Sequence, residues 1–212
     1  MFVRRLQHSA FTWAKESQRV GKVHASASGP GPPAHLIYNP SQLPDTATLL
    51  LVARSAASSG FTDHAFWEAC SLQARKLCSE RAGDANLHAL ARYTVAAASV
   101  HHRDNELMYN MGDMAVAEAE RSFLDPESIM FVLESHAILA FRNDRVLQKL
   151  ELVLYDMLQQ SRVTAACLSS SLLSLSRLFS ASVLPDVADA GYSRQELIDG
   201  AARVCLEHIS FF

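Results

Sequence analysis

The side chains most able to do chemistry in this 212-residue chain are histidines, cysteines and acids. His101 and His102 stand side by side before Arg103, in a stretch that is expected to turn. A zinc site needs at least a third ligand at a suitable spacing, and no neighbouring residue supplies one. We therefore interpret the two histidines as solvated turn residues and expect no metal site.

The acids and serines give no catalytic pattern either. His136 follows Glu134 by two residues, so the two side chains do not share a helix face, and no HExxH motif exists. The chain also lacks a glycine-rich phosphate loop and a GxSxG nucleophile turn. Residues 169–171 are three serines, which are simpler to read as small residues inside a packed helix. We expect no enzyme activity, no cofactor and no small-molecule substrate.

The four cysteines are Cys70, Cys78, Cys167 and Cys205. No two of them form a CxxC pair, and none has a histidine at metal-binding spacing. They are therefore expected to be buried, reduced thiols.

Six basic residues are candidates for contacting RNA or a partner protein. Three of them recur near predicted turns between helices, where stacked helices would bring them to one edge: Arg103, Arg142 and Arg145. The other three are expected on helices: Arg92, Lys149 and Arg177. Such a stripe could contact RNA phosphates. The alternative is that all six are ordinary solvated charges.

The overall charge argues against a free nucleic-acid-binding protein. The formal net charge is −3. Residues 1–33 hold five basic residues and one acid, so the rest of the chain has 14 basic and 21 acidic residues, a net charge of −7. Proteins that bind nucleic acids alone usually carry a basic surface. An acidic chain favours contacts with proteins, although a local basic patch remains compatible with it.

The elements that must position these residues are predicted to be helices. Each apolar stripe with helical spacing follows a residue whose side chain can cap a helix N-terminus. These predicted caps are Asp45, Asp63, Asp84, Asp104, Asp125, Asp144, Thr164 and Ser193. Ser193 and Glu196 together form a capping-box pattern.

The spacing of the predicted caps indicates a repeat. One series is Asp45, Asp84, Asp125 and Thr164, whose positions advance along the chain in nearly equal steps. The interleaved series is Asp63, Asp104 and Asp144, which advances in steps of almost the same length. Two series with a shared step predict an all-α protein, an α-solenoid of stacked helical hairpins with a period of about 40 residues. The alternative is an ordinary helical bundle.

The ends of the chain differ from this pattern. Residues 1–23 are basic, poor in acids and amphipathic, with Leu6 and Trp13 in one helical arc and Arg5 in the opposite arc. They are similar to a mitochondrial transit peptide, or else form a basic surface helix. Five of the 7 prolines make residues 24–44 a linker. Residues 45–182 hold the hairpins and 183–212 a C-terminal capping helix. No stretch is long and apolar enough to predict a membrane span.

One unit resembles a known family of organellar proteins. In the stretch 46–70, a Leu- and Ala-rich helix precedes Gly60-Phe61-Thr62-Asp63, and Phe66-Trp67 opens the next helix. This phrase is similar to the repeat of the octotricopeptide and heptatricopeptide class, which is related to FAST-kinase-like and RAP-domain proteins. Residues 102–104 with Leu107, and 142–144 with Leu147, are looser copies. The resemblance covers 45–179 and includes no RAP domain.

The resemblance implies organellar RNA metabolism or a structural place in mitochondrial ribosomes. Together with the charge, it leads us to expect a non-catalytic subunit of a large mitochondrial assembly, in first place the ribosome, in contact with rRNA and neighbouring proteins. The expected location is the matrix or the matrix side of the inner membrane. One alternative is a protein-only scaffold subunit of a respiratory or ATP-synthase complex. A free RNA-processing factor fits less well, because the chain is short and acidic.

Overall fold

The computed structural model describes residues 43–79, 86–179 and 194–209, and these residues confirm the all-α prediction, with no strand among them. Their helices are α3 (Thr46–Ser58), α4 (His64–Ser79), α5 (Leu87–Ser99), α6 (Asn105–Glu120), α7 (Pro126–Ile138), α8 (Asp144–Gln159), α9 (Ala165–Phe179) and α10 (Arg194–Ile209). The predicted transit-like segment 1–23, the linker up to residue 42 and residues 183–193 lie outside the described residues.

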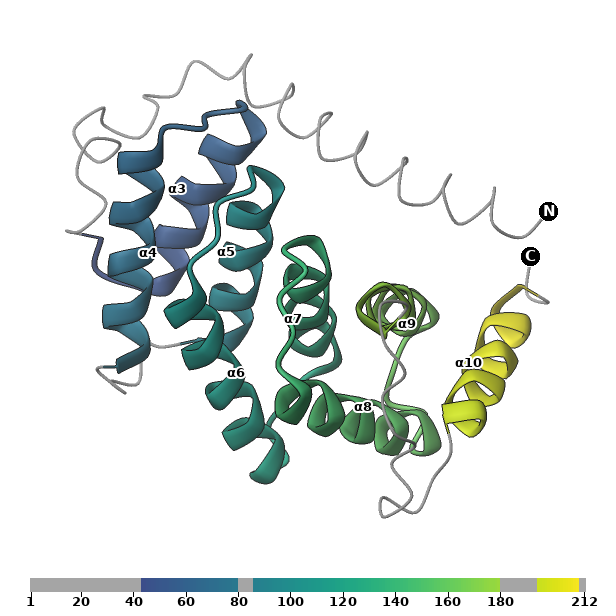
Figure 1. The fold of residues 1–212 in the computed structure, drawn as a ribbon. Helices are drawn as coiled ribbons and strands as arrows, with labels where there is room; N and C mark the ends of the chain where they lie inside the picture. The colour runs from purple at the N-terminus through teal and green to yellow at the C-terminus, as the bar shows by residue number, and fades with distance from the viewer. Residues whose placement is uncertain (1–42, 80–85, 180–193, 210–212) are drawn as a thin grey trace.

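Helices that are two apart in the chain pack against each other. α5 contacts α3 and α7, and α7 also contacts α9, so these four helices form what we call the odd row. α6 contacts α4 and α8, and α8 contacts α10, so these four form the even row. Figure 1 shows α9 on the inner side of the arc that α6, α8 and α10 follow. Each row is therefore a series of neighbouring helices, and the outer sides of these helices face the solvent one after another.

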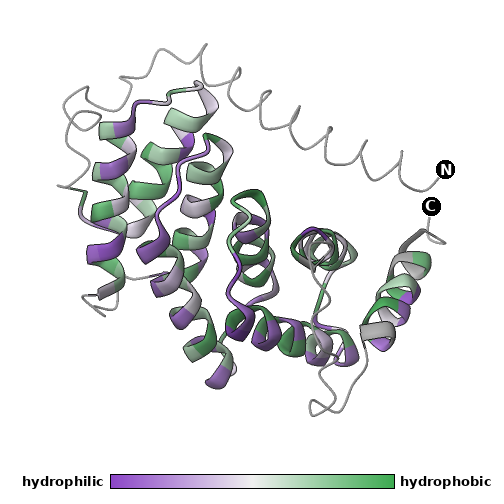
Figure 2. Cartoon of the chain, in the orientation of Figure 1, coloured by the Kyte–Doolittle hydropathy of each residue, from purple (hydrophilic) through white to green (hydrophobic). Residues whose placement is uncertain are grey.

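The helices bury their apolar faces in two adjoining clusters. Hydrophobic and hydrophilic residues alternate along the helices in Figure 2, as amphipathic helices require. One cluster is centred on α3, α4 and α5 and includes Trp67 and Tyr93, and the other extends from α5 to α10 and includes Leu147. Met114 of α6 packs against both clusters. The core therefore runs the length of the two rows.

One close approach in the even row depends on a glycine. A Cβ atom built at Gly112 of α6 would lie 2.8 Å from Cγ2 of Val146 in α8. Val146 is fully buried and its branched side chain has little freedom to move aside. The missing side chain at position 112 thus allows α6 and α8 to pack closely.

Five of the predicted caps hold helix N-termini in the structure. Asp45, Asp104 and Asp125 each accept a hydrogen bond from the backbone N–H three residues later, at 2.7, 3.0 and 2.8 Å. Asp63 accepts from the N–H of residue 66 at 2.8 Å, and Thr164 Oγ1 accepts from that of residue 167 at 3.2 Å. Each bond satisfies a donor that has no partner inside the helix.

One of the other predicted caps is wrong, and two lie outside the described residues. α8 is capped by Asn143, whose side chain accepts from Val146 N at 3.4 Å, so Asp144 is the first helical residue. α5 is capped by Asn86, and the predicted cap Asp84 lies outside the described residues, as does Ser193. An asparagine oxygen caps as well as a carboxylate does. Asp144 still stabilises α8, because an acid in the first turn interacts favourably with the helix dipole.

Five helix junctions share one turn geometry. In each, one residue just after the helix has a positive φ: Gly60 (70°), His101 (59°), Ser122 (60°), Ala140 (48°) and Ser161 (55°). The N–H that follows donates to the carbonyl five residues earlier, as in a Schellman motif; the Phe141 N to His136 O bond of 2.9 Å is one example. A single one of these five positions is glycine, so four junctions hold a side chain in a conformation that glycine adopts more easily.

We expect Ala140→Gly to stabilise the protein by about 0.5–1 kcal/mol, because it removes the steric cost of the positive φ. Ala137→Gly, in the last turn of α7, is the matched control and should destabilise by about 1 kcal/mol. Urea unfolding followed by circular dichroism measures both. Equal destabilisation by the two substitutions would contradict the turn assignment.

Candidate functional site

Arg103 and Arg142, two of the residues expected to contact a partner, lie at neighbouring helix junctions. Nη1 of Arg103 lies 3.4 Å from the carbonyl oxygen of Leu139, and its guanidinium carbon lies 5.4 Å from the centroid of the Phe141 ring. Because Phe141 immediately precedes Arg142, Arg103 extends from the α5–α6 junction to the α7–α8 junction. Together with Arg145 on the first turn of α8, these residues form what we call the basic edge.

Each arginine of the basic edge already has a polar partner. Nε of Arg142 lies 2.5 Å from Oδ1 of Asp144, and Nη1 of Arg145 lies 3.6 Å from Oδ1 of Asp113. Nε of Arg103 donates to the side chain of the neighbouring Asn105 at 2.7 Å. An anion that approached this edge would have to displace carboxylates or be repelled by them. Two of the three basic-edge arginines are therefore paired with a carboxylate, whereas Arg103 is bonded to an uncharged amide and a backbone carbonyl.

The three remaining candidates are divided between the two rows. Lys149 lies on α8, one helical turn after Arg145, and so belongs to the even row with the basic edge. Arg92 lies on α5 and Arg177 on α9, both in the odd row. Arg177 attracts the carboxyl of Glu134 in α7, although burial keeps the pKa of Glu134 above its usual value. The six predicted residues thus do not form a single stripe.

Arg92 lines a groove on the odd row that the sequence did not reveal. The groove lies across α3, α5 and α7 and has a volume of about 210 Å³. Its lining residues are Arg54, Ala57, Ser58, Arg92, Val95, Ala96, Ser99 and Phe131. The guanidinium carbon of Arg92 lies 5.5 Å from the centroid of the Phe131 ring, which is cation–π distance. We call this feature the odd-row groove.

The odd-row groove contains two positive charges with little to neutralise them. Among the described residues, no carboxylate lies within 4.0 Å of the guanidinium of Arg54 or Arg92. Burial lowers the pKa of Arg92, the charge of Arg54 lowers it further, and Glu127 opposes both effects more weakly. The guanidinium group is a permanent cation in proteins, so both side chains bring positive charge to the groove. An anion bound in the groove would therefore be stabilised by the two positive charges.

The groove residues occupy matching positions in successive helices. Counting from the caps Asn86 and Asp125, Arg92 and Phe131 are each the sixth residue, and the sixth residue after Asp45 is Leu51. Arg54 is the ninth residue after its own cap, which places it one turn further along the same helix face. If the odd-row helices had been aligned by their caps, the sequence alone would have placed Arg54 on the same helix face as Arg92 and Phe131.

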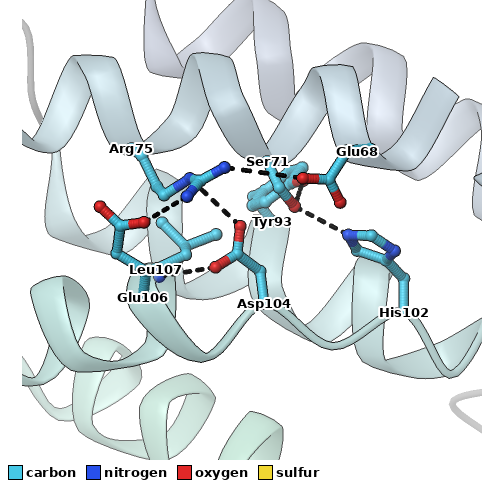
Figure 3. A network of polar contacts seen from close by, with 8 residues as sticks. All are labelled: Glu68, Ser71, Arg75, Tyr93, His102, Asp104, Glu106 and Leu107. Carbon is cyan, nitrogen blue, oxygen red and sulfur yellow. Dashed lines mark hydrogen bonds and ion pairs between the residues drawn. The ribbon is translucent and has the colours of Figure 1, made fainter. Parts of the chain in front are cut away.

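A polar network joins the first two hairpins, and it contains a Ser–His–Tyr arrangement that resembles catalytic chemistry (Figure 3). The hydroxyl oxygen of Ser71 lies 3.0 Å from Nε2 of His102 and 3.0 Å from the hydroxyl of Tyr93. Burial lowers the pKa of His102 and raises that of Tyr93, so both groups are neutral at pH 7. The cavity beside them has a volume of about 10 Å³, room for at most one water molecule. A substrate could not reach Ser71 without opening the interface.

The same network fastens α4 to the start of α6 through Arg75. Its guanidinium lies 3.3 Å from Oδ2 of Asp104, the α6 cap, and 3.6 Å from Oε1 of Glu68. It also forms an ion pair with Glu106 in the first turn of α6. Arg75 therefore holds the Asp104 carboxylate, which in turn accepts the Leu107 N–H (Figure 3).

We expect Arg75→Ala to destabilise the protein by about 1–3 kcal/mol, since it removes the charged partner of a partly buried carboxylate. Arg145→Ala breaks the exposed pair with Asp113 and should change stability by less than about 0.5 kcal/mol. The free energy of unfolding in urea gives both values. An equal effect of the two substitutions would show that the Arg75 network does not join the hairpins.

Within the described residues, no three histidine, cysteine or acidic side chains are grouped so that they could hold a metal ion. None of the helices in the described ranges is long and apolar enough to cross a membrane. No protein-family model, curated protein or solved structure matches this chain.

Proposed function

We propose that this chain is a non-catalytic α-solenoid with a period of about 40 residues and that it serves as a subunit of a large mitochondrial assembly. The mitochondrial ribosome is the first candidate, with contacts to rRNA and to neighbouring proteins. The observation that carries this proposal is the packing of helices into two rows through junctions of one geometry. Such an arrangement offers long surfaces to partners and no enclosed site for a substrate.

The positions of the helices support the proposed period. The odd-row helices α5, α7 and α9 begin at positions 87, 126 and 165, so the two steps between them are equal. The even-row helices α6 and α8 begin at positions 105 and 144, which is a step of the same length. The first step is slightly longer in both rows, from position 46 to 87 and from position 64 to 105. The longer step falls where residues 80–86 connect α4 to α5, a connection longer than each of the five junctions that share the turn geometry.

Support for the mitochondrial location and for RNA comes from different parts of the chain. The basic, amphipathic residues 1–23 favour import into mitochondria. The resemblance of residues 45–179 to octotricopeptide-like units favours an RNA-containing partner. The odd-row groove adds two arginines that have no described carboxylate within 4.0 Å. Together they favour a ribonucleoprotein over an assembly made of protein alone.

The second candidate function is a protein-only scaffold in a respiratory or ATP-synthase complex. It is favoured by large apolar side chains that the described residues leave exposed outside the groove. Phe123 at the α6–α7 junction is 77% exposed, Leu72 on α4 is 55% exposed and Tyr109 on α6 is 52% exposed. Aromatic residues of this kind are common at protein–protein interfaces.

Sedimentation of a mitochondrial lysate on a density gradient separates the two candidates. The proposal predicts that the protein sediments with ribosomal subunits and moves to lighter fractions after ribonuclease treatment. A protein that sediments with respiratory or ATP-synthase complexes, with or without ribonuclease, would overturn the ribosomal assignment in favour of the scaffold. Sedimentation as a free protein in both samples would contradict both candidates.

A further inference from the structure

We propose that the odd-row groove binds the phosphate backbone of single-stranded RNA through Arg54 and Arg92. The proposal rests on the proposed function and deepens it, because it assigns the RNA contact to the odd row. It also moves the contact away from the basic edge, where the pattern of arginines before helix caps had placed it.

The charges in the groove are arranged to receive an anion. Arg54 comes from α3 and Arg92 from the neighbouring helix α5, and they are close enough for the charge of one to lower the pKa of the other. A phosphate bound between them would relieve this repulsion and accept hydrogen bonds from both guanidinium groups. Two of the three basic-edge arginines, by contrast, already pair with carboxylates, Arg142 with Asp144 and Arg145 with Asp113.

The ring of Phe131 holds Arg92 in a defined place. The guanidinium carbon lies 5.5 Å from the ring centroid, and the ring of His88, also on α5, makes an edge-to-face contact with Phe131 at 5.5 Å between centroids. Arg92 is also half-buried, so its long side chain is partly ordered before any ligand arrives. Ordering a side chain in advance reduces the entropy lost on binding. Arg92 is therefore the anchoring cation, and Arg54 is the more exposed of the two.

The size of the groove suits a group smaller than a drug-sized ligand. Its volume of about 210 Å³ is below the roughly 300 Å³ at which pockets for small ligands usually begin. The groove lies across three helices on the surface of the odd row, so a chain can enter and leave it. A phosphate with its adjoining sugar is of a suitable size for such a site.

The apolar surroundings favour RNA over an acidic peptide. Ala57, Val95 and Ala96 line the groove, and Leu51, at the position that matches Arg92 one helix earlier, is 68% exposed. A phosphodiester places a permanent charge next to a sugar, whose apolar face can pack on such aliphatic surfaces. An acidic peptide supplies carboxylates without rings. The one carboxylate that acts on Arg92 from α7, Glu127, has the weakest of the three influences on its charge.

Fluorescence anisotropy with a labelled oligouridine RNA and the full chain tests the proposal. We expect the double variant Arg54→Ala/Arg92→Ala to weaken binding by about tenfold per lost arginine. The slope of log K against log salt should become shallower by about 0.7, because the two arginines together hold one phosphate and each phosphate contact on a single strand contributes about that amount. The matched control is Arg142→Ala/Arg145→Ala, which changes the net charge equally and should leave the RNA affinity within about twofold.

Further arms make the result decisive. Arg54→Lys/Arg92→Lys keeps the charge but loses the paired donors, and it should bind more weakly than the unchanged chain and more tightly than the alanine variant. Circular dichroism of each variant shows whether the fold is retained. Equal RNA affinity of the groove variant and the unchanged chain, or a larger loss in the basic-edge variant, would overturn the proposal. Tighter binding of a labelled hexaglutamate peptide than of the RNA would replace RNA with an acidic protein segment.

A failure of the proposed function and a failure of the groove assignment would give different results in the gradient and the binding assay. If the protein sediments with ribosomal subunits but the groove variant binds RNA normally, the proposed function stands and the groove assignment falls. If the groove binds RNA as expected but the protein never sediments with ribosomal subunits, the site stands and the assembly is a different one.

Discussion

Trp67→Ala is expected to destabilise the protein by about 4 kcal/mol, the largest effect of any single substitution considered. Trp67 is 1% exposed and lies in the first core cluster. Its indole Nε1 donates to the carbonyl oxygen of Phe61 at 2.8 Å, which ties α4 to the junction that precedes it. Its ring lies edge-on to Phe66, with the centroids 5.4 Å apart, and stacks near His102 at 6.2 Å. Alanine would remove all of these contacts and leave a cavity.

Two further substitutions sharpen this result. Trp67→Phe keeps most of the ring volume and loses the bond to Phe61, so we expect about 1–2 kcal/mol. Leu72→Ala is the surface control on the same helix, because Leu72 is 55% exposed, and it should cost less than about 0.5 kcal/mol. Urea unfolding at one pH gives all three values. A loss below about 1 kcal/mol for Trp67→Ala would mean that the first hairpin does not pack as described.

The second large effect is a loss of stability in acid that we assign to His136. This side chain is fully buried in α7, and burial lowers its pKa to about 4. In the unfolded chain a histidine titrates near 6.5, so below that pH the unfolded state binds a proton that the folded state excludes. The contribution of His136 to the free energy of unfolding is thus fully present above about pH 6.5 and is lost as the pH falls toward 4. A difference of this size corresponds to about 3 kcal/mol.

Urea unfolding at a series of pH values between 7.5 and 4.5 measures this loss. His136→Leu keeps a buried apolar side chain and cannot be protonated, so its stability should fall less steeply with pH than that of the unchanged protein. His101→Ala is the matched control, because His101 is exposed and should leave the slope as it is. Parallel pH profiles for the His136→Leu variant and the unchanged protein would show that the imidazole is not held neutral.

The helices could be predicted because their signals are local. A capping side chain followed by an apolar stripe is contained within a few residues, and Asp45, Asp63, Asp104, Asp125 and Thr164 cap as expected. The error at α8 arose because Asn143 and Asp144 are adjacent and both can cap. Local chemistry cannot choose between them, whereas the turn that begins at Ala140 with a positive φ fixes which residue comes next to the helix.

The candidate site was harder to predict because it depends on which helices pack together. Arg103 and Arg142 were expected to lie at one edge because each precedes a predicted helix cap, and in the structure they do lie at neighbouring junctions. Their partners, Asn105 and Asp144, lie two residues further along the chain. The partner of Arg145 was not foreseen, because Asp113 of α6 comes near it only once α6 lies beside α8. Arg54 and Arg92 are far apart in the sequence and become neighbours through the packing of α3 on α5. Free positive charge is a property of that packing and not of either residue.

Site-specific photo-crosslinking in intact mitochondria tests the central claim most directly. A photoreactive amino acid in place of Ser99, an exposed residue that lines the odd-row groove, should become attached to RNA on illumination. The same amino acid in place of Glu120, exposed at the end of α6 in the even row, should not. RNA attached at position 99 and absent at position 120 is the result we predict. Attachment of protein alone at position 99 would contradict the assignment of an RNA-binding subunit.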